Sequence, residues 1–302
     1  MNELAASTAA VVVVYRLAID IEPTLLALQG AVGQVLVVDN HPQRHHDLAA
    51  TAQRLDIGYL HAGNVGGLAG AYNRALQWLQ GHCPQSRQVV FLDEDSDASP
   101  LQALLADADT ERALAQAQTA AVAAAYRDRA TGLRGRYIRL ARYRLSFNPR
   151  EFSDLRQVAF VINSMSVWRL QALQQIGPFN EGLAIDHVDT EYCLRARQLA
   201  LLLYVHGSHE FAHSIGQRRR FRFLGREMQA GGHGPERRYL IGRNTSWLAR
   251  SWLWREPAFA FLCATRLAYE AVGIVAVEDR ALAKLGALLR GALSGLLMPR
   301  SA

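Results

Sequence analysis

The sequence predicts an α/β fold with a doubly wound, mostly parallel sheet and a helical extension at its C-terminal end. Continuous apolar segments alternate with helical patterns, polar clusters follow several of these segments directly, and the last part of the chain shows only helical patterns. Such apolar runs are typical of strands in a parallel sheet, because helices cover both of its faces. The 302 residues are enough for one large α/β domain with an added helical segment.

The first half of the chain contains the clearest alternation. We expect strands at residues 10–15, 35–38, 57–61 and 89–92, and helices at 22–32, 47–55 and 68–79. Pro23 fits the first turn of the first of these helices.

The second half continues the pattern less regularly. We expect a strand near residues 158–162, a helix at 167–176 and a strand at 201–205, and helical structure from Glu236 almost to the end. The predicted organisation is therefore one α/β domain over residues 1–250 and a helical region over residues 251–302.

Charge and cysteine usage limit the partners and the compartment. The formal net charge is +6, and arginines cluster in residues 127–150, 218–226 and 237–243. Such clusters attract nucleic acid, anionic membrane or a diphosphate-bearing substrate, and charge alone does not distinguish these. Three cysteines without metal-type spacing, and an N-terminus without signal-peptide features, lead us to expect a cytoplasmic protein.

The strongest polar cluster follows the apolar segment 89–92. Asp93 and Asp95 stand at alternate positions just beyond a predicted strand, where α/β sheets bind ligands. Two such carboxylates can share a divalent cation with phosphate oxygens, and the metal would neutralise charge on a departing diphosphate. The alternative is a solvated acidic turn.

Two weaker clusters follow other predicted strands. Asp39 could accept hydrogen bonds from a base or a ribose, or simply form an Asx turn before Pro42. The loop at residues 63–67 allows a ligand to approach the backbone, so Asn64 and Gly66 are candidate nucleotide contacts. Because the loop matches neither the dinucleotide fingerprint nor a P-loop, an ordinary strand-to-helix turn stays open.

A third acidic group begins a predicted helix. Asp186 and Asp189 are three residues apart and share a helical face, whereas Glu191 can pair with Arg195 at i,i+4. Asp189 has no such evident partner, so we predict that it is a general base. A helix N-terminus lowers the pKa of a carboxylate, but a modest pKa suffices for a proton taken up only in the transition state. The alternative for the group is a helix cap with an acidic first turn.

His213 is a further candidate metal ligand through a neutral imidazole nitrogen. A lone histidine is more often packed or hydrogen-bonded, so residue type alone does not decide.

The order of these clusters resembles the large inverting glycosyltransferase family of the GT-A fold, and within it the bacterial rhamnosyltransferase-like branch. The motifs that carry the resemblance span roughly residues 10–245 and lie at 37–40, 64–67, 91–96, 163–164, 177–181, 186–195, 213–216 and 237–244. Any one motif is weak, but the ordered series is specific.

The resemblance implies a role for each candidate residue. Asp39 would bind the nucleobase, Asp93 and Asp95 would hold the donor and a Mg²⁺ or Mn²⁺ ion, and His213 would be a further metal ligand. Asp189 would be the catalytic base, and Asp186 and Glu191 would shape the acceptor site. Glu94 departs from the branch, which more often has an amide there, and adds negative charge beside the metal.

The implied reaction is a single displacement with inversion. The implied donor is dTDP-L-rhamnose, and the acceptor is a saccharide or a lipid-linked glycan made in the cytosol. A UDP-galactofuranose or UDP-hexose donor is the alternative within the class, and a basic nucleic-acid-binding module is the alternative outside it. A nicotinamide dehydrogenase is disfavoured because no glycine fingerprint follows the first predicted strand.

The apolar segment 259–277 resembles a membrane span but contains Arg266 and Glu270. Each charge near a bilayer centre costs about 2.5–3.5 kcal/mol on insertion scales. Packing on the domain or on a second subunit is one interpretation. We prefer an amphipathic hairpin on the anionic inner membrane surface, without a span.

Overall fold

The structure is a computed structural model that describes residues 1–213, 219–223 and 225–299. The chain forms two compact units. Unit 1 contains Met1–Arg127, Arg134–Tyr137 and Asn148–His213, and unit 2 contains Asp128–Leu133, Ile138–Phe147 and Ser214–Ala302.

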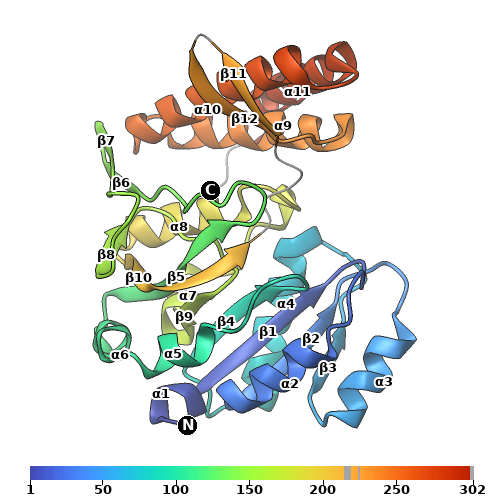
Figure 1. Ribbon diagram of the computed structural model, residues 1–302, viewed down its shortest axis with the longest axis vertical. Helices are drawn as coiled ribbons and strands as arrows, with labels where there is room; N and C mark the ends of the chain where they lie inside the picture. Colours follow the sequence, from blue (N-terminus) through green and yellow to red (C-terminus); the bar gives the residue numbers. More distant parts are fainter. Residues whose placement is uncertain (214–218, 224, 300–302) are drawn as a thin grey trace. The chain divides into compact units, whose positions relative to one another are not determined.

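Unit 1 is built on an eight-stranded sheet in the order β3-β2-β1-β4-β9-β5-β10-β8 (Figure 1). The strands are β1 Thr8–Val14, β2 Gln34–Asp39, β3 Gly58–His61, β4 Gln88–Asp93, β5 Thr119–Asp128, β8 Leu155–Val158, β9 Ser166–Arg169 and β10 Leu202–His213. β1, β2, β3 and β4 are mutually parallel, whereas β9 is antiparallel to β4 and β5, and β8 is antiparallel to β10. The predicted mostly parallel α/β sheet is confirmed.

The strands that matter for the site end at one edge of this sheet. Two contacts show that β5 and β10 run in the same direction. The Leu202 N–H donates to the Gln118 carbonyl where both strands begin, and the Arg127 and Glu210 side chains pair at 2.6 Å near the ends of both strands. Since β9 is antiparallel to both β4 and β5, the carboxyl ends of β1, β2, β4, β5 and β10 face the same side.

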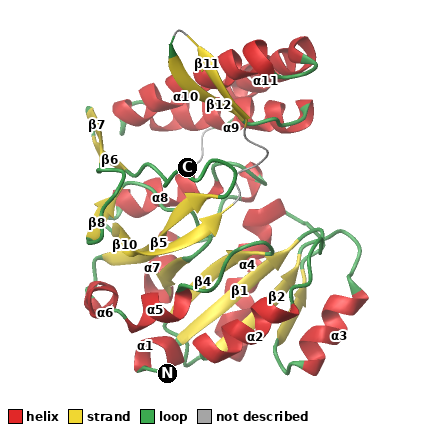
Figure 2. Ribbon diagram, in the orientation of Figure 1, coloured by secondary structure: helices red, strands yellow, loops and turns green. Residues whose placement is uncertain are grey.

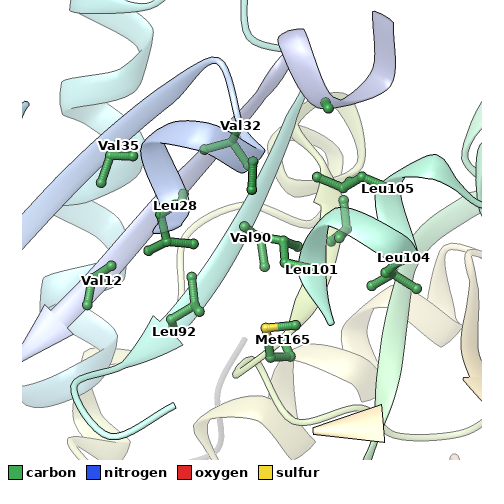
Figure 3. Close-up of a cluster of buried hydrophobic side chains, with 14 of the residues drawn as sticks. Val12, Leu28, Val32, Val35, Val90, Leu92, Leu101, Leu104, Leu105 and Met165 are labelled. Atoms are coloured by element: carbon green, nitrogen blue, oxygen red, sulfur yellow. The ribbon is translucent and has the colours of Figure 1, made fainter. Parts of the chain in front are cut away.

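Helices cover both faces of the sheet (Figure 2). Those of unit 1 are α1 Glu3–Ala6, α2 Glu22–Ala31, α3 His46–Arg54, α4 Gly67–His82, α5 Leu101–Ala106, α6 Ala108–Ala115, α7 Leu170–Ile176 and α8 Val188–Gln198, with a 3-10 turn η1 at Glu181–Leu183. Val90 and Leu92 pack in one apolar cluster with Leu28 of α2 (Figure 3). Phe91, between them, contacts Tyr72 of α4 on the opposite face. This two-sided burial explains the continuous apolar runs.

The arginine-rich segment after β5 has a partly structural explanation. Arg134 is 4% exposed, donates to the Phe152 and Gly207 carbonyls, and pairs with Glu210. Beyond it lies a hairpin, β6 Ile138–Ala141 and β7 Arg144–Phe147. Buried arginines satisfied in this way do not need an external anion.

Unit 2 consists mainly of three helices and a hairpin. They are α9 Pro235–Trp252, α10 Pro257–Val277, α11 Ala281–Leu297, β11 Arg219–Phe223 and β12 Arg226–Ala230. Glycines allow α9 and α11 to approach closely: a Cβ atom at Gly242, Gly291 or Gly295 would overlap the backbone of the other helix.

Two buried charged side chains of unit 2, Arg238 and Lys284, form ion pairs. Arg238 is fully buried and forms ion pairs with Glu270 and Glu278. Glu270 therefore turns toward α9 and not toward the open surface of α10. Lys284 pairs with Glu278 at 3.1 Å and with Asp279 at 2.8 Å, which offsets the cost of burying its charge.

Among the described residues, α10 is the one helix long and apolar enough to cross a membrane. Its most apolar window has a mean hydropathy of 1.6 and is 22% buried. The core helix of a soluble protein passes the same test, so length and composition alone do not decide.

Several predicted elements differ from those observed. The strand expected near residues 158–162 is β8, which ends at Val158. The first residues of the helix expected at 167–176 belong to strand β9, and α7 begins at Leu170. The strand expected at 201–205 continues to His213.

Candidate active site

The acidic cluster after β4 lies on a fixed turn. The Asp93 N–H donates to Ser96 Oγ at 2.9 Å, and the Ser96 N–H donates to the Asp93 carbonyl at 3.0 Å. Ser96 Oγ also lies 2.6 Å from Ser164 Oγ. The turn is thereby held against the segment that precedes β9, and it presents Asp93, Glu94 and Asp95 at the edge of the sheet.

Asp189, in the first turn of α8, is brought to the same place. Burial raises the pKa of Asp189 to about 7; the negative charges of Asp93 and Asp186 add to this rise, and the Asn163 backbone N–H opposes it. The helix N-terminus was expected to lower this pKa, but burial and the neighbouring carboxylates dominate. Its pKa suits a base that works near neutral pH.

Asp93 has a raised pKa as well. Burial, followed by the charges of Asp95 and Glu94, raises it to about 6. Crowded carboxylates of this kind are suited to a hard divalent cation, which would relieve their repulsion. The oxygen donors of Asp93 and Asp95 therefore fit Mg²⁺ or Mn²⁺.

Two buried groups lie beside these acids: Asn163 belongs to the 163–164 motif, to which the sequence analysis gave no role, and Tyr72 was missed. Asn163 is 1% exposed, and its side chain interacts with the Tyr72 hydroxyl, which lowers the pKa of Tyr72. Asp189 Oδ1 is buried without a hydrogen-bond partner among the described residues. Burial raises the pKa of Tyr72, and the negative charges of Asp93 and Asp189 raise it further. Tyr72 therefore lies near both acids. Unsatisfied buried polar atoms are uncommon and are consistent with a site that accepts a ligand.

The segment before α8 has an unusual backbone. Ala184, Asp186 and His187 have φ values of 57°, 56° and 66°, in the left-handed region that favours glycine. Such conformations cost free energy and are concentrated at functional sites. No sequence pattern indicates them, because none of the three residues is glycine.

The glycine loop before α4 packs against this same segment. Gly66 and Gly67 have φ values of 73° and 62°, and added Cβ atoms would overlap the Glu181 carboxylate and the Ala184 carbonyl, respectively. These glycines therefore permit close contact within the site. Asn64 Oδ1 accepts a hydrogen bond from Asn40 at 3.4 Å. The nucleotide contacts expected of Asn64 and Gly66 stay predictions.

Asp39 ends β2 and is fully buried. It accepts hydrogen bonds from the His41 N–H at 3.2 Å, the His45 N–H at 2.7 Å, His45 Nδ1 at 2.9 Å and the Tyr59 hydroxyl at 2.8 Å. Burial raises its pKa, but these hydrogen bonds, with the His45 N–H first, lower it more. The bond to His41 forms the Asx turn that the sequence offered as the alternative, and a nucleobase role for Asp39 stays a prediction.

Glu191 does not join the acidic group. It is 2% exposed, and its two oxygens accept from Arg195 at 2.9 and 3.0 Å, as the i,i+4 spacing predicts. Arg195 also donates to the Ile176 and Pro178 carbonyls, so the pair fastens α8 to the turn after α7. The acceptor role of Glu191 remains a prediction from the resemblance.

His213 is the last residue of β10, at the same edge as Asp93. Its ring centroid lies 6.1 Å from that of Tyr126 and 5.7 Å from that of Phe211. The rest of its motif, residues 214–216, lies outside the described residues. Its metal role stays a prediction.

A second group with metal-ligand chemistry lies elsewhere in unit 1. The ligand atoms of Asp107, His206 and His209 lie within 4.8 Å of one another, and each Nε2 is 3.1 Å from an oxygen of Asp107. The Ser208 N–H donates to His206 Nδ1 at 3.3 Å, so the proton of a neutral His206 ring is on Nε2 and points to Asp107. Hydrogen bonds thus account for this cluster, which sequence spacing did not reveal.

Comparison with known proteins supports the fold. No family model and no curated protein matches the sequence. The structure aligns with that of GalNAc-T7 with UDP, GalNAc and Mn²⁺ at a TM-score of 0.50 and 11% identity, over 78% of this chain and 48% of that one. The fold is GT-A-like. At this identity the likeness shows the fold alone, and the chain spans about half the length of GalNAc-T7.

Two bacterial structures align less closely. One is described as a mannose-1-phosphate geranyltransferase from Thermus thermophilus, with a TM-score of 0.40, 15% identity, and coverage of 68% of this chain and 75% of that one. The other is mannosyl-3-phosphoglycerate synthase from Rubrobacter xylanophilus, with a TM-score of 0.31, 20% identity, and coverage of 42% of each chain.

Proposed function

We propose that this chain is a metal-dependent, inverting glycosyltransferase that moves a sugar from a nucleotide donor to an acceptor hydroxyl. One observation carries the proposal: the fold brings Asp93, at the end of β4, close enough to Asp189 in the first turn of α8 for its charge to act on that carboxyl, whose Oδ1 is buried and whose pKa is raised. A cation-binding carboxylate and a near-neutral base thus lie together, where α/β sheets bind ligands. The GT-A-like fold supports the same reaction class.

In the proposed reaction Asp189 accepts the proton of the acceptor hydroxyl while that oxygen bonds to the anomeric carbon. The bond from this carbon to the diphosphate oxygen breaks in the same displacement, so the configuration inverts. Asp93 and Asp95, with His213, would hold Mg²⁺ or Mn²⁺, which when bound neutralises charge on the departing diphosphate. Asp186 lies close enough to affect Asp189 and is our candidate for acceptor contact.

For the donor we propose dTDP-L-rhamnose, with a UDP-galactofuranose or UDP-hexose as the alternative. This choice is supported by the motif resemblance alone. The proposed acceptor is a saccharide or a lipid-linked glycan.

A thermal-shift panel of dTDP, UDP, GDP and CMP, each with and without Mn²⁺, tests the proposal. A ligand at about 100 times its Kd stabilises the fold by roughly 2.7 kcal/mol. We expect one nucleotide to stabilise the protein, and to do so more strongly with Mn²⁺. Absence of stabilisation by all four nucleotides under both conditions would contradict a nucleotide-sugar donor.

We also propose that unit 2 lies on an anionic membrane surface, which would keep the protein at the cytoplasmic face. Large apolar side chains of its helices and of the segment between α9 and α10 are exposed: Trp254, Phe261, Val275, Leu282 and Leu297 are 72%, 70%, 65%, 89% and 85% exposed. Exposed apolar surface with nearby basic residues, such as Arg280 and Arg290, is typical of helices that lie in a membrane interface.

A further inference from the structure

Glu94, the central residue of the acidic cluster, faces the loop that follows β1. Its Oε2 accepts hydrogen bonds from the backbone N–H groups of Tyr15 at 3.0 Å, Arg16 at 3.1 Å and Leu17 at 3.0 Å. The sequence placed its negative charge beside the metal. The structure instead directs that charge to three consecutive backbone donors.

This loop adopts a conformation that needs support. Leu17 has a φ of 47°, in the left-handed region that non-glycine residues rarely occupy. Consecutive N–H groups that converge on one point form a concave site for an anion. The Glu94 carboxylate is the anion in this structure, and Leu17 also packs against the apolar core. The loop is therefore fixed by a charge on one side and by apolar contact on the other.

The loop in turn places side chains near Asp39. The Tyr15 ring centroid lies 5.7 Å from that of His41, and the His41 centroid lies 4.8 Å from that of His45. His45 donates to Asp39 through its backbone N–H and contacts it through Nδ1. A continuous series of contacts thus connects Glu94 at the end of β4 with Asp39 at the end of β2.

We propose that Glu94 is a positioning residue for the nucleoside end of the donor site. It fixes the loop after β1, while its neighbours Asp93 and Asp95 serve the diphosphate end. This inference rests on the proposed function. A carboxylate suits this role, since it accepts stronger, charge-assisted hydrogen bonds from backbone N–H groups.

Amide hydrogen exchange at Tyr15, Arg16 and Leu17 tests whether Glu94 holds the loop. For Glu94→Ala we expect exchange at these amides to accelerate by about 10- to 100-fold, because hydrogen bonds to a charged group are lost. Glu94→Gln keeps an acceptor oxygen and should show a smaller effect. Glu3→Ala is the matched control, because this carboxylate is 84% exposed in its pair with Arg87. Unchanged exchange in Glu94→Ala would overturn the inference.

Calorimetric titration with UDP and with dTDP, with and without Mn²⁺, tests the consequence for the site. We expect Glu94→Ala to weaken nucleotide binding about tenfold or more, and Glu94→Gln to restore part of it. The gain in affinity from Mn²⁺ should match the wild type, and its loss in both variants would make Glu94 a metal ligand and overturn the positioning role. A wild-type protein that binds neither nucleotide would contradict the proposed dTDP or UDP donor and the nucleoside role, whereas the exchange data would still show whether Glu94 holds the loop.

Discussion

The negative charge of Asp93 raises the pKa of Asp189, although the two residues are almost a hundred positions apart and belong to β4 and α8. The fold thus maintains a repulsive arrangement at one edge of the sheet. Such an arrangement is costly unless a cation or a proton compensates it. The repulsion between Asp93 and Asp189 therefore affects both the proposed site and the free energy of unfolding.

Asp189→Asn should be more stable than the wild type at pH 8. The folded-state pKa of Asp189, about 7, lies above its ordinary value of 3.8, so the ionised form is disfavoured in the fold. This free-energy penalty is largest above pH 7, where Asp189 is ionised in the folded protein, and it disappears as the pH falls toward 3.8. We expect a gain in unfolding free energy on the order of 1–3 kcal/mol at pH 8 and almost none near pH 4. Urea unfolding in EDTA measures it, and equal stability at every pH would disprove the raised pKa.

The same variant should bind the donor but lose turnover. Removing the base should lower kcat roughly 10²–10⁴-fold while leaving nucleotide affinity nearly unchanged. In the wild type, kcat/KM should rise with pH as Asp189, whose pKa burial raises above the ordinary carboxyl value, loses its proton. Near-normal transfer by Asp189→Asn would move the base role to Asp186, because Glu191 is paired with Arg195. An equal loss of donor affinity would place Asp189 in the metal site.

Asp95→Ala should abolish the metal-dependent part of nucleotide binding and leave the fold intact. The reason is its place next to Asp93, whose pKa it raises. Calorimetry of the nucleotide with and without Mn²⁺ measures the coupling. Asp109→Ala removes an exposed carboxylate of α6 and should keep the coupling of the wild type. If Asp95→Ala retained it too, the assignment of Asp95 as a ligand would be wrong.

Gly66→Ala should destabilise the protein, whereas Gly81→Ala near the other end of α4 should not. At Gly66 a Cβ atom would overlap the Glu181 side chain, and the φ of 73° is strained for alanine. We expect a loss of roughly 1–3 kcal/mol from strain and overlap together. At Gly81 nothing lies within 4 Å, so alanine should stabilise the helix by about 0.5–1 kcal/mol. Thermal unfolding of the two variants compares them, and equal effects would mean that the loop before α4 adapts freely.

The sequence predicted what local patterns determine. Buried strands show their apolar runs directly, and β4 was expected at 89–92 and observed at Gln88–Asp93. The acidic residues after β4 were recognised because they directly follow a predicted strand, where α/β sheets bind ligands. The pair of Glu191 with Arg195 followed from helical spacing alone.

The rest depends on contacts between distant residues, which no local pattern records. The turn of Glu94 toward Tyr15 joins positions 79 residues apart, and the left-handed backbone at Ala184 involves no glycine. The burial of Asp189, which reverses the expected direction of its pKa shift, is likewise a property of the assembled site.

The exposed apolar side chains of unit 2 lead to a prediction about membranes. Leu282 and Leu297 are 89% and 85% exposed on α11, so Leu282→Glu combined with Leu297→Glu should leave the fold unchanged. We expect the wild type to float with anionic vesicles at low salt and less at high salt, since basic residues contribute to binding. Losing two leucines from the interface should weaken this binding by tenfold or more, because burying each contributes about 1.5–3 kcal/mol.

Leu26→Glu is the matched control, since Leu26 is 51% exposed on α2 of unit 1 and should not affect flotation. Flotation that resists high salt and the double substitution would indicate a deeper insertion, for which α10 is the candidate. A wild-type protein that stays off anionic vesicles at low salt would show that the apolar surface of α11 has no membrane role. Packing against a second copy of the chain would then be the interpretation to test, by measuring mass in solution.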